Sequence, residues 1–183
     1  MCSGSATDMK KVFALILFQE EGFFLEAGVL DGETNSNTLQ LEKKHGWKGI
    51  LMEADFTTLK GLIEKHRKAW VVPNCVSTRA HTIVATFMDR GRLGKVLEEA
   101  ADPGLGQQHQ WNRGSDIICL PLYSVLQAFN QSSLDYLSLD VEGSELEVLK
   151  TIPFDLIDIK VIIYLNTYLK LLLIYLIYFR RCL

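Results

Sequence analysis

The sequence contains few cysteines, and they follow none of the patterns that build a site. Its four cysteines, Cys2, Cys75, Cys119 and Cys182, are widely spaced and form no CxxC pair. This spacing excludes a cysteine-based zinc site and a small scaffold held by disulfides. We therefore interpret them as isolated thiols, with Cys75 and Cys119 buried, because free cysteine packs like a small apolar residue.

The sequence also lacks metal-ligand spacing and a basic face. The histidines, His45, His66, His81 and His109, are isolated from one another, so we expect no metal site. The chain has 19 lysines and arginines against 22 aspartates and glutamates, a formal net charge of −3, and no long basic run. Nucleic-acid binding normally needs a basic face, so we expect no nucleic-acid partner.

The length and composition of the chain are sufficient for one folded domain. The chain has 183 residues, of which 48% are hydrophobic, and this is typical of a single domain with a full core. We divide it into a helical lead-in at 1–19, a domain at 20–162 and an apolar tail at 163–183. Residues 9–19 are expected to form a short amphipathic helix and not a signal peptide, because QEEGFF leads directly into the first strand.

The tail is unusually rich in Leu, Ile and Tyr. Between Val161 and Phe179, the residues least suited to a membrane are Asn166, Thr167 and Lys170. A membrane-spanning helix needs about 20 mostly apolar residues, and a central lysine opposes insertion. Three interpretations stay open: a membrane anchor, an element that covers or pairs with the sheet, or a divergent end that arises from splicing or from the gene model.

Strand and helix patterns alternate along the domain, which is typical of an α/β fold with a parallel sheet. The expected strands cover 23–27, 49–53, 70–76, 134–140 and 159–165. The expected helices cover 36–45, 56–68, 121–129 and a segment after Ser144, where Ser144 and Glu147 fit a capping box. Residues 81–88 and 116–120 are expected to be further strands, and 92–101 a short helix.

Glycines and acids gather where the expected parallel strands end. Glu26, Gly28, Asp31 and Gly32 follow the first strand, Glu53 ends the second, and Asp140 and Glu142 follow the fourth. In an open parallel sheet, ligands bind beyond the carboxyl ends of the strands. These residues are therefore expected to surround one ligand site.

This pattern favours a nucleoside that carries an amino-acid tail. Gly28 and Gly32 would let the backbone approach the ligand, and amides at the start of the next helix would hold its carboxylate. Glu53 lies 21 positions after Gly32, a spacing that suits a carboxylate bound to both ribose hydroxyls. Glu26 and Asp31 would engage the ammonium or order the turn around it. S-adenosylmethionine is such a molecule. A dinucleotide fits less well, because the turn is G-x-x-x-G and its acids would repel a pyrophosphate.

Two further pairs of residues each have two interpretations. As catalytic residues, Asp140 and Glu142 would face the transferred group, orient the acceptor or act as a base. Alternatively, they satisfy the start of the next helix and a neighbouring turn. Asn74 and Ser77, after the third strand, would approach an adenine edge, or they form a turn that satisfies itself.

Three segments resemble the FkbM-type methyltransferase domain: GFFLEAGVLDGETNSNTLQLEKKHGWKGILMEAD, KHRKAW and LDYLSLDVEGSELEVLKTIPFD. The resemblance covers about residues 20–162 and is closer to the animal subgroup related to the insect protein Star. It implies a Rossmann-like class I methyltransferase fold, with a mostly parallel sheet and helices on both faces, and S-adenosylmethionine as cofactor. It also implies that the E-A-G-x-x-D-G turn binds the donor, that Glu53 binds its ribose, and that LDVEG lies beside the reaction centre.

The resemblance ends after IKVII, where YLNTYLKLLLIYLIYFRRCL lacks the glycine and acid of the family's closing turn. We therefore expect a truncated or divergent C-terminus without the closing strands. Such an end would leave the last parallel strand as a bare apolar edge and would open the acceptor side of the pocket.

Two functions follow as expectations. The first is an S-adenosylmethionine-dependent methyltransferase that acts on an oxygen or nitrogen nucleophile of an unknown acceptor, in the cytoplasm. The second is a catalytically inactive, Star-like protein that moves a membrane cargo protein through the secretory pathway. That second protein would associate with the endoplasmic reticulum or Golgi membrane, where the tail would supply any membrane contact.

Overall fold

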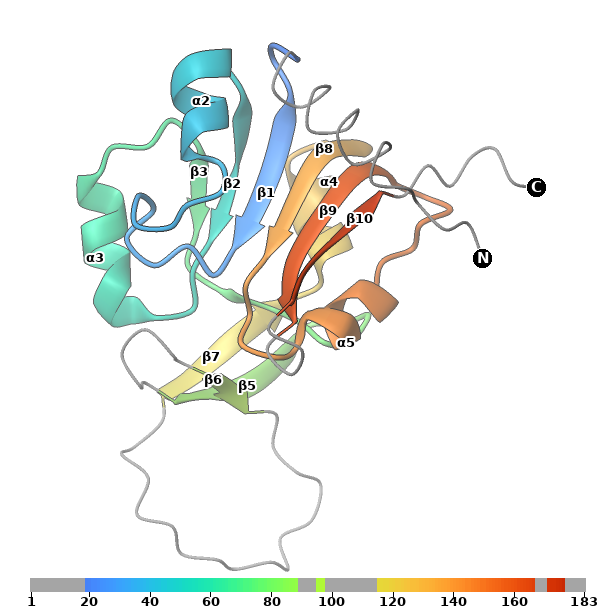
Figure 1. Ribbon diagram of the computed structural model, residues 1–183. Helices are drawn as coiled ribbons and strands as arrows, with labels where there is room; N and C mark the ends of the chain where they lie inside the picture. The colour runs from blue at the N-terminus through green and yellow to red at the C-terminus, as the bar shows by residue number, and fades with distance from the viewer. Residues whose placement is uncertain (1–18, 89–94, 98–114, 167–170, 177–183) are drawn as a thin grey trace, which may run out of the picture.

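The computed structural model describes residues 19–88, 95–97, 115–166 and 171–176, which form two sheets with flanking helices (Figure 1). Sheet A contains β1 (Phe23–Ala27), β2 (Lys48–Met52), β3 (Trp70–Val72), β8 (Ser133–Leu139), β9 (Asp158–Asn166) and β10 (Leu171–Leu176). Sheet B contains β4 (Cys75–Val76), β5 (Ile83–Met88), β6 (Lys95–Leu97) and β7 (Ser115–Leu120). The helices are α2 (Leu39–His45), α3 (Phe56–Glu64), α4 (Leu122–Ala128) and α5 (Glu145–Lys150).

Sheet A is parallel except at one edge. Its strand order is β10-β9-β8-β1-β2-β3, and β10 runs antiparallel to β9 while the other pairs are parallel. The chain builds outward from β1 through β2 and β3 on one side, and later through β8 and β9 on the other. The strand order therefore reverses between β1 and β8, which is where open parallel sheets bind their ligands.

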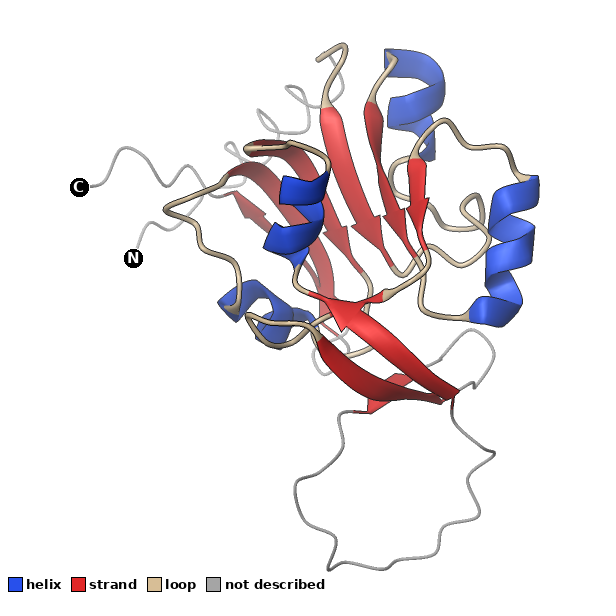
Figure 2. Ribbon diagram, turned by 180° about the vertical axis from the view of Figure 1, so that it is seen from behind, coloured by secondary structure: helices blue, strands red, loops and turns tan. Residues whose placement is uncertain are grey.

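The central strands β1, β2 and β8 are largely buried on both faces, which agrees with their mostly apolar sequences. Leu25 and Ala27 pack on one face against residues of α4 and α5, whereas Phe24 packs on the other face against residues of α2 and α3. Helix α4 lies in front of the sheet in Figure 2, on the face hidden in Figure 1. The expected α/β fold, with a mostly parallel sheet and helices on both faces, is confirmed.

Sheet B lies beyond the carboxyl ends of β1 and β8 (Figure 1). Its order is β4-β7-β5-β6, and the pairing of β4 with β7 is parallel and joins only Cys75 with Cys119 and Val76 with Leu120. A disulfide links Cys75 to Cys119. The interpretation of these cysteines as isolated thiols is therefore wrong, although both are buried as expected. The two residues are 44 positions apart, and they meet only because β7 returns beside β4.

Two segments differ from the elements expected for them. The strand expected at 70–76 is divided between the two sheets, because Pro73 offers no N–H and the amide of Asn74 turns back to the carbonyl of Val72 at 2.9 Å. The helix expected at 92–101 is wrong at its centre, where β6 pairs antiparallel with β5. Pairing with a sheet edge overrides local helix propensity there. The remainder of that segment lies outside the described residues.

Helix α3 ends at Glu64, earlier than the expected end at residue 68. His66 adopts a positive φ of 51°, which stops the helix because this backbone region is unfavourable for a residue with a Cβ. At the other end, the side chain of Asp55 caps the helix by accepting a hydrogen bond from the amide of Thr57 at 2.7 Å.

Near the C-terminus the chain continues in sheet A. Strand β9 ends at Asn166, close to the expected strand end at 165 and past the expected domain boundary at 162. Strand β10 pairs with it from Leu171 opposite Asn166 to Leu176 opposite Val161. The expectation that closing strands are missing therefore needs correction, because one antiparallel strand covers the edge of β9. Within the described residues, no helix has the length and apolar character needed to cross a membrane. The helix expected at 9–19 lies almost entirely outside these residues and stays a prediction.

Candidate functional site

A cavity of about 590 Å³ lies at the carboxyl ends of β1, β2 and β8 and extends to sheet B. Six of the nine residues predicted for the site line it: Glu26, Gly28, Glu53, Asn74, Asp140 and Glu142. The other three, Asp31, Gly32 and Ser77, do not. The strand-end pattern thus located the cavity, but the contacts of each side chain decide its role.

Glu53, at the end of β2, holds the loop after β1. The residue is 6% exposed, and its Oε2 accepts hydrogen bonds from the amides of Val29 at 3.0 Å and Leu30 at 2.7 Å. Its Oε1 accepts one from the amide of Asp55 at 2.8 Å. Burial raises the pKa of Glu53, and the charge of Asp55 adds to this, against the opposing effect of the three amides. A carboxylate has about four acceptor positions, so little of this one remains for a ribose.

Asp31 and Gly32 serve the turn and not the cavity. Oδ1 of Asp31 accepts hydrogen bonds from the amides of Glu33 at 3.0 Å and Thr34 at 2.7 Å. The bond from the Thr34 amide is the main reason that the pKa of Asp31 is lowered. Gly32 has a φ of +74°, and a Cβ there would lie 2.3 Å from Cδ1 of Leu62. The turn-ordering interpretation of Asp31 is therefore supported, and Gly32 permits close packing of α3.

Glu26 is buried on β1 and holds the segment before α2. Its Oε1 accepts a hydrogen bond from the amide of Asn37 at 2.7 Å, and its Oε2 accepts bonds from the hydroxyls of Ser36 and Thr38. Oγ of Ser36 in turn accepts the amide of Leu39, the first residue of α2, at 3.2 Å. The amides expected to hold a ligand carboxylate are therefore bonded to side chains of the protein itself.

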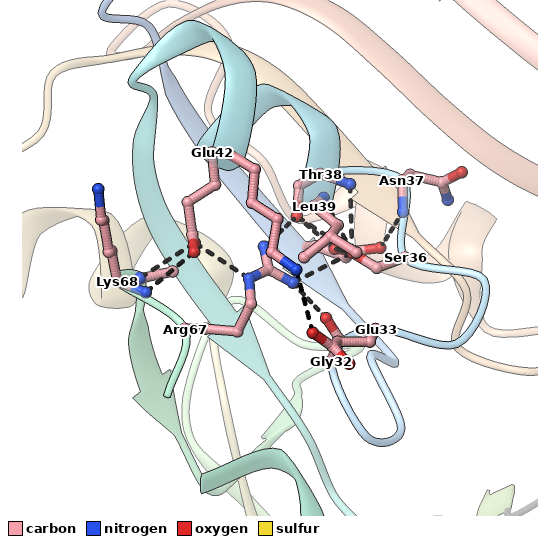
Figure 3. Close-up of polar contacts among 12 residues, drawn as sticks. Gly32, Glu33, Ser36, Asn37, Thr38, Leu39, Glu42, Arg67 and Lys68 are labelled. Carbon is pink, nitrogen blue, oxygen red and sulfur yellow. Dashed lines mark hydrogen bonds and ion pairs between the residues drawn. The ribbon is translucent and has the colours of Figure 1, made fainter. Parts of the chain in front are cut away.

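A buried arginine, which was not predicted from the sequence, adds further hydrogen bonds to the segment between β1 and α2 (Figure 3). The side chain of Arg67 is 1% exposed, and its Nε donates to Oε2 of the equally buried Glu42 at 3.1 Å. Its terminal nitrogens donate to the carbonyl of Gly32 and to the hydroxyls of Ser36 and Thr38. In the sequence, Arg67 stands within the basic run KHRKAW, which reads as a solvated surface. Only the fold shows that one member of the run is buried.

Asn74 and Ser77 make contacts within the protein. Asn74 lines the cavity, but its Nδ2 donates to the carbonyl of Ile118 at 3.0 Å and so ties the start of sheet B together. The hydroxyl of buried Ser77 donates to the carbonyl of His81 at 2.8 Å, which supports the self-satisfying turn. The next residue, Thr78, lines the cavity, and its buried hydroxyl has no partner among the described residues.

Gly28 allows the loop after β1 to pack against the end of β8. It has a φ of +79°, and a Cβ there would lie 1.9 Å from the carbonyl oxygen of Asp140. The amide of Gly28 donates to the carbonyl of Met52, and the amide of Asp140 donates to that of Ala27, each at 3.0 Å. Gly28 therefore lets three neighbouring strand ends converge at the cavity.

Asp140 and Glu142 are the acids of the predicted site that stay open to the cavity. Neither carboxylate makes a hydrogen bond or ion pair with another described residue. The capping box expected for α5 is wrong, because Ser144 makes no side-chain cap bond and Glu145 accepts the amide of Val141 at 3.0 Å instead. Glu145 also accepts the amide of Gly143 at 3.1 Å, so it holds the neighbouring turn that the structural interpretation gave to Asp140.

The pKa of both open acids is raised. For Asp140 the main cause is desolvation by the surrounding protein, even though the residue is exposed at the cavity, and the charges of Glu145 and Glu26 add to it. For Glu142 burial again comes first, followed by the charges of Asp140 and Glu145. A cation in the cavity would relieve this repulsion and an anion would increase it. These two acids therefore favour a positively charged ligand in their part of the cavity.

Sheet B supplies a different, apolar part of the cavity wall. Ile83, Phe87 and Val96 line it together with Cys75 and Cys119. Among the described residues, no cluster of three or more His, Cys, Asp or Glu side chains is arranged to hold a metal ion. The cavity therefore combines an acidic part with an apolar part.

The methyltransferase FkbM domain matches residues 26–170, more than half of the 183-residue chain. The comparison with curated proteins gives no match. The chain belongs to the FkbM methyltransferase family. Its parallel sheet with helices on both faces agrees with a Rossmann-like methyltransferase fold, and the family supports a methyltransferase-like function. The match identifies the family and not a subgroup within it.

Proposed function

We propose that the cavity binds S-adenosylmethionine and that the protein transfers its methyl group to an oxygen or nitrogen atom of an acceptor. The observation that carries this proposal is the pair of open carboxylates, Asp140 and Glu142, at the switch point of an FkbM-family sheet. A cofactor with a sulfonium and an ammonium is complementary to these charges.

The residues of the cavity fit this cofactor. Asp140 and Glu142 would hold its cationic part, and the apolar wall of sheet B would take its base. The unpartnered hydroxyl of Thr78 offers a hydrogen bond beside that wall. When bound, the cofactor supplies an electrophilic methyl group.

The two acids have different tasks in the proposed reaction. An oxygen or nitrogen nucleophile must lose a proton when it becomes methylated, so the site needs a proton acceptor. The charge of Asp140 helps to raise the pKa of Glu142, which makes Glu142 the better acceptor while Asp140 is ionised. We therefore assign charge complementarity to Asp140 and proton transfer to Glu142.

Isothermal titration calorimetry of the full chain with S-adenosylmethionine tests the proposal. Saturable binding at one site, followed by transfer of a labelled methyl group to an acceptor, supports it. Absence of binding to both the cofactor and its demethylated product rejects it.

The second candidate function is a non-catalytic, Star-like role in the transport of a membrane cargo protein through the secretory pathway. The disulfide between Cys75 and Cys119 favours it, because disulfides persist mainly in oxidising compartments such as the endoplasmic reticulum. The carboxylates of Glu26 and Glu53 favour it too, because their hydrogen bonds within the protein leave few acceptor positions for a cofactor. Co-precipitation of a membrane cargo without cofactor binding would support this role, and cofactor turnover without cargo would reject it.

A further inference from the structure

The disulfide forms part of the wall of the cavity. Cys75 and Cys119 both line it, and they are 4% and 0% exposed and belong to the small core of sheet B. Ile83, Phe87 and Val96 continue the wall on either side of them. Any ligand that fills the apolar part of the cavity therefore lies against this bridge.

The bridge also lies at the joint between the two sheets. Strand β4 follows β3 of sheet A after Pro73 and pairs with β7 over only two residues. The other polar contacts at this joint are the hydrogen bond from Asn74 Nδ2 to the carbonyl of Ile118 and the bond from the Ser77 amide to the carbonyl of Leu120. A two-residue parallel ladder is a weak connection, so the covalent bond fixes the position of the wall.

The same segment is connected to the acidic part of the cavity. The carbonyl of Val72 accepts the amides of both Glu53 and Asn74, at 3.2 and 2.9 Å. Glu53 in turn holds the loop after β1 through Val29 and Leu30. These hydrogen bonds connect the start of β4, through Val72 and Glu53, to the loop that faces Asp140.

We propose that the Cys75–Cys119 disulfide controls ligand binding in this cavity, so that the oxidised protein binds S-adenosylmethionine more tightly than the reduced protein. The inference rests on the proposed function, because it concerns the same ligand. Reduction by dithiothreitol breaks the S–S bond, and each sulfur gains one electron and one proton while dithiothreitol is oxidised to its cyclic disulfide. The two sulfur atoms then move from bonding to van der Waals distance, and the wall that they form shifts.

Thermodynamic linkage gives the inference a second consequence. If oxidation strengthens ligand binding by some factor, the ligand must favour the disulfide over the dithiol by the same factor. Bound S-adenosylmethionine should therefore make the bridge harder to reduce. Coupling between two sites of a protein is typically about 5- to 150-fold, and we expect at least about fivefold here.

The experiment uses the full chain with Cys2→Ser and Cys182→Ser, so that Cys75 and Cys119 are its remaining cysteines. Calorimetry measures the affinity for S-adenosylmethionine in the oxidised state, after reduction and after reoxidation. Thiol counting confirms each state, and circular dichroism confirms the fold. The Cys75→Ser/Cys119→Ser variant provides a permanently open bridge, and the wild-type chain is measured in parallel.

The expected result is affinity at least about fivefold weaker after reduction and in the Cys75→Ser/Cys119→Ser variant, restored by reoxidation, with slower reduction of the ligand-bound protein. Equal affinity in both states would overturn the inference and leave the proposed function intact. Four free thiols in the untreated wild-type chain would overturn it as well, and so would global unfolding on reduction. Absence of binding in both states would instead reject the proposed function itself.

Discussion

The carbonyl oxygen of Asp140 occupies the space that a Cβ on Gly28 would need, since the two atoms would be only 1.9 Å apart. This contact joins the loop after β1 to the end of β8 at the wall of the cavity. The glycine is therefore required by the protein backbone itself, whether or not a ligand is bound.

Substitution Gly28→Ala should destabilise the protein more than Gly46→Ala. Both glycines have a positive φ, +79° and +67°, which costs alanine about 1–2 kcal/mol. A Cβ on Gly46 meets nothing within 4 Å, whereas one on Gly28 collides with backbone and should add about 1–3 kcal/mol. Urea unfolding of both variants measures the difference. Equal losses of stability would show that the loop moves away from β8 without cost.

Substitution Glu53→Ala should lower stability in the absence of any ligand. It leaves the amides of Val29, Leu30 and Asp55 without their acceptor, and each unsatisfied buried amide costs about 1–3 kcal/mol. Relief of the desolvated charge offsets part of this, so we expect a net loss of about 2–4 kcal/mol. Exposed Glu64→Ala is the matched control and should change stability by less than about 0.5 kcal/mol. Unchanged stability of the Glu53 variant would contradict the structural role of this acid and would favour a role in ligand binding alone.

Substitution Arg67→Met should lower the folding stability more than most single changes in the loop region. It leaves the carboxylate of Glu42 buried without its cation, which typically costs about 3–5 kcal/mol. It also removes the donors that hold the carbonyl of Gly32 and the hydroxyl of Thr38. Exposed Lys60→Met serves as control. Hydrogen exchange should show faster opening of residues 32–38 in the Arg67 variant, and unchanged exchange there would contradict the role assigned to this side chain.

The open acids should make stability depend on pH in a defined direction. The folded-state pKa values of Asp140 and Glu142 are raised above the ordinary 3.8 and 4.5, so the folded protein keeps these protons to higher pH than the unfolded chain does. Their contribution to stability is thus fully present below the ordinary values and is lost as pH rises through the raised ones. Relative to Asp140→Asn/Glu142→Gln, the wild-type chain should lose stability as pH rises from about 4. Parallel denaturation curves measured across this range would test it, and a constant difference would contradict the shifts.

Much of the fold follows from the sequence because its signals are local. The runs around Phe24, Leu51 and Leu137 are mostly apolar, as strands buried on both faces require. The disulfide could not be found in this way, because Cys75 and Cys119 become neighbours only when β7 pairs with β4. The strand β6 was missed for a related reason, since pairing with β5 decides its conformation.

Most of the residues predicted for the site line the cavity, but the sequence did not predict their contacts. Glu26 and Glu53 line the cavity and Asp31 does not, yet all three carboxylates accept hydrogen bonds from backbone amides of the protein. The sequence shows that an acid is present, but the partner of that acid depends on three-dimensional contacts. Asp140 and Glu142 line the cavity, whereas Glu145 accepts the amides of Val141 and Gly143 in the turn between them and α5.

Asp140 is proposed to be the counter-charge of a cationic cofactor, and one titration tests this role directly. Calorimetry compares S-adenosylmethionine binding to the wild-type chain, to Asp140→Asn and to the exposed control Glu64→Gln, with unfolding curves for each. We predict at least about tenfold weaker binding for Asp140→Asn with no loss of folding stability, and unchanged binding for the control. Equal affinity of Asp140→Asn and the wild-type chain would contradict the account.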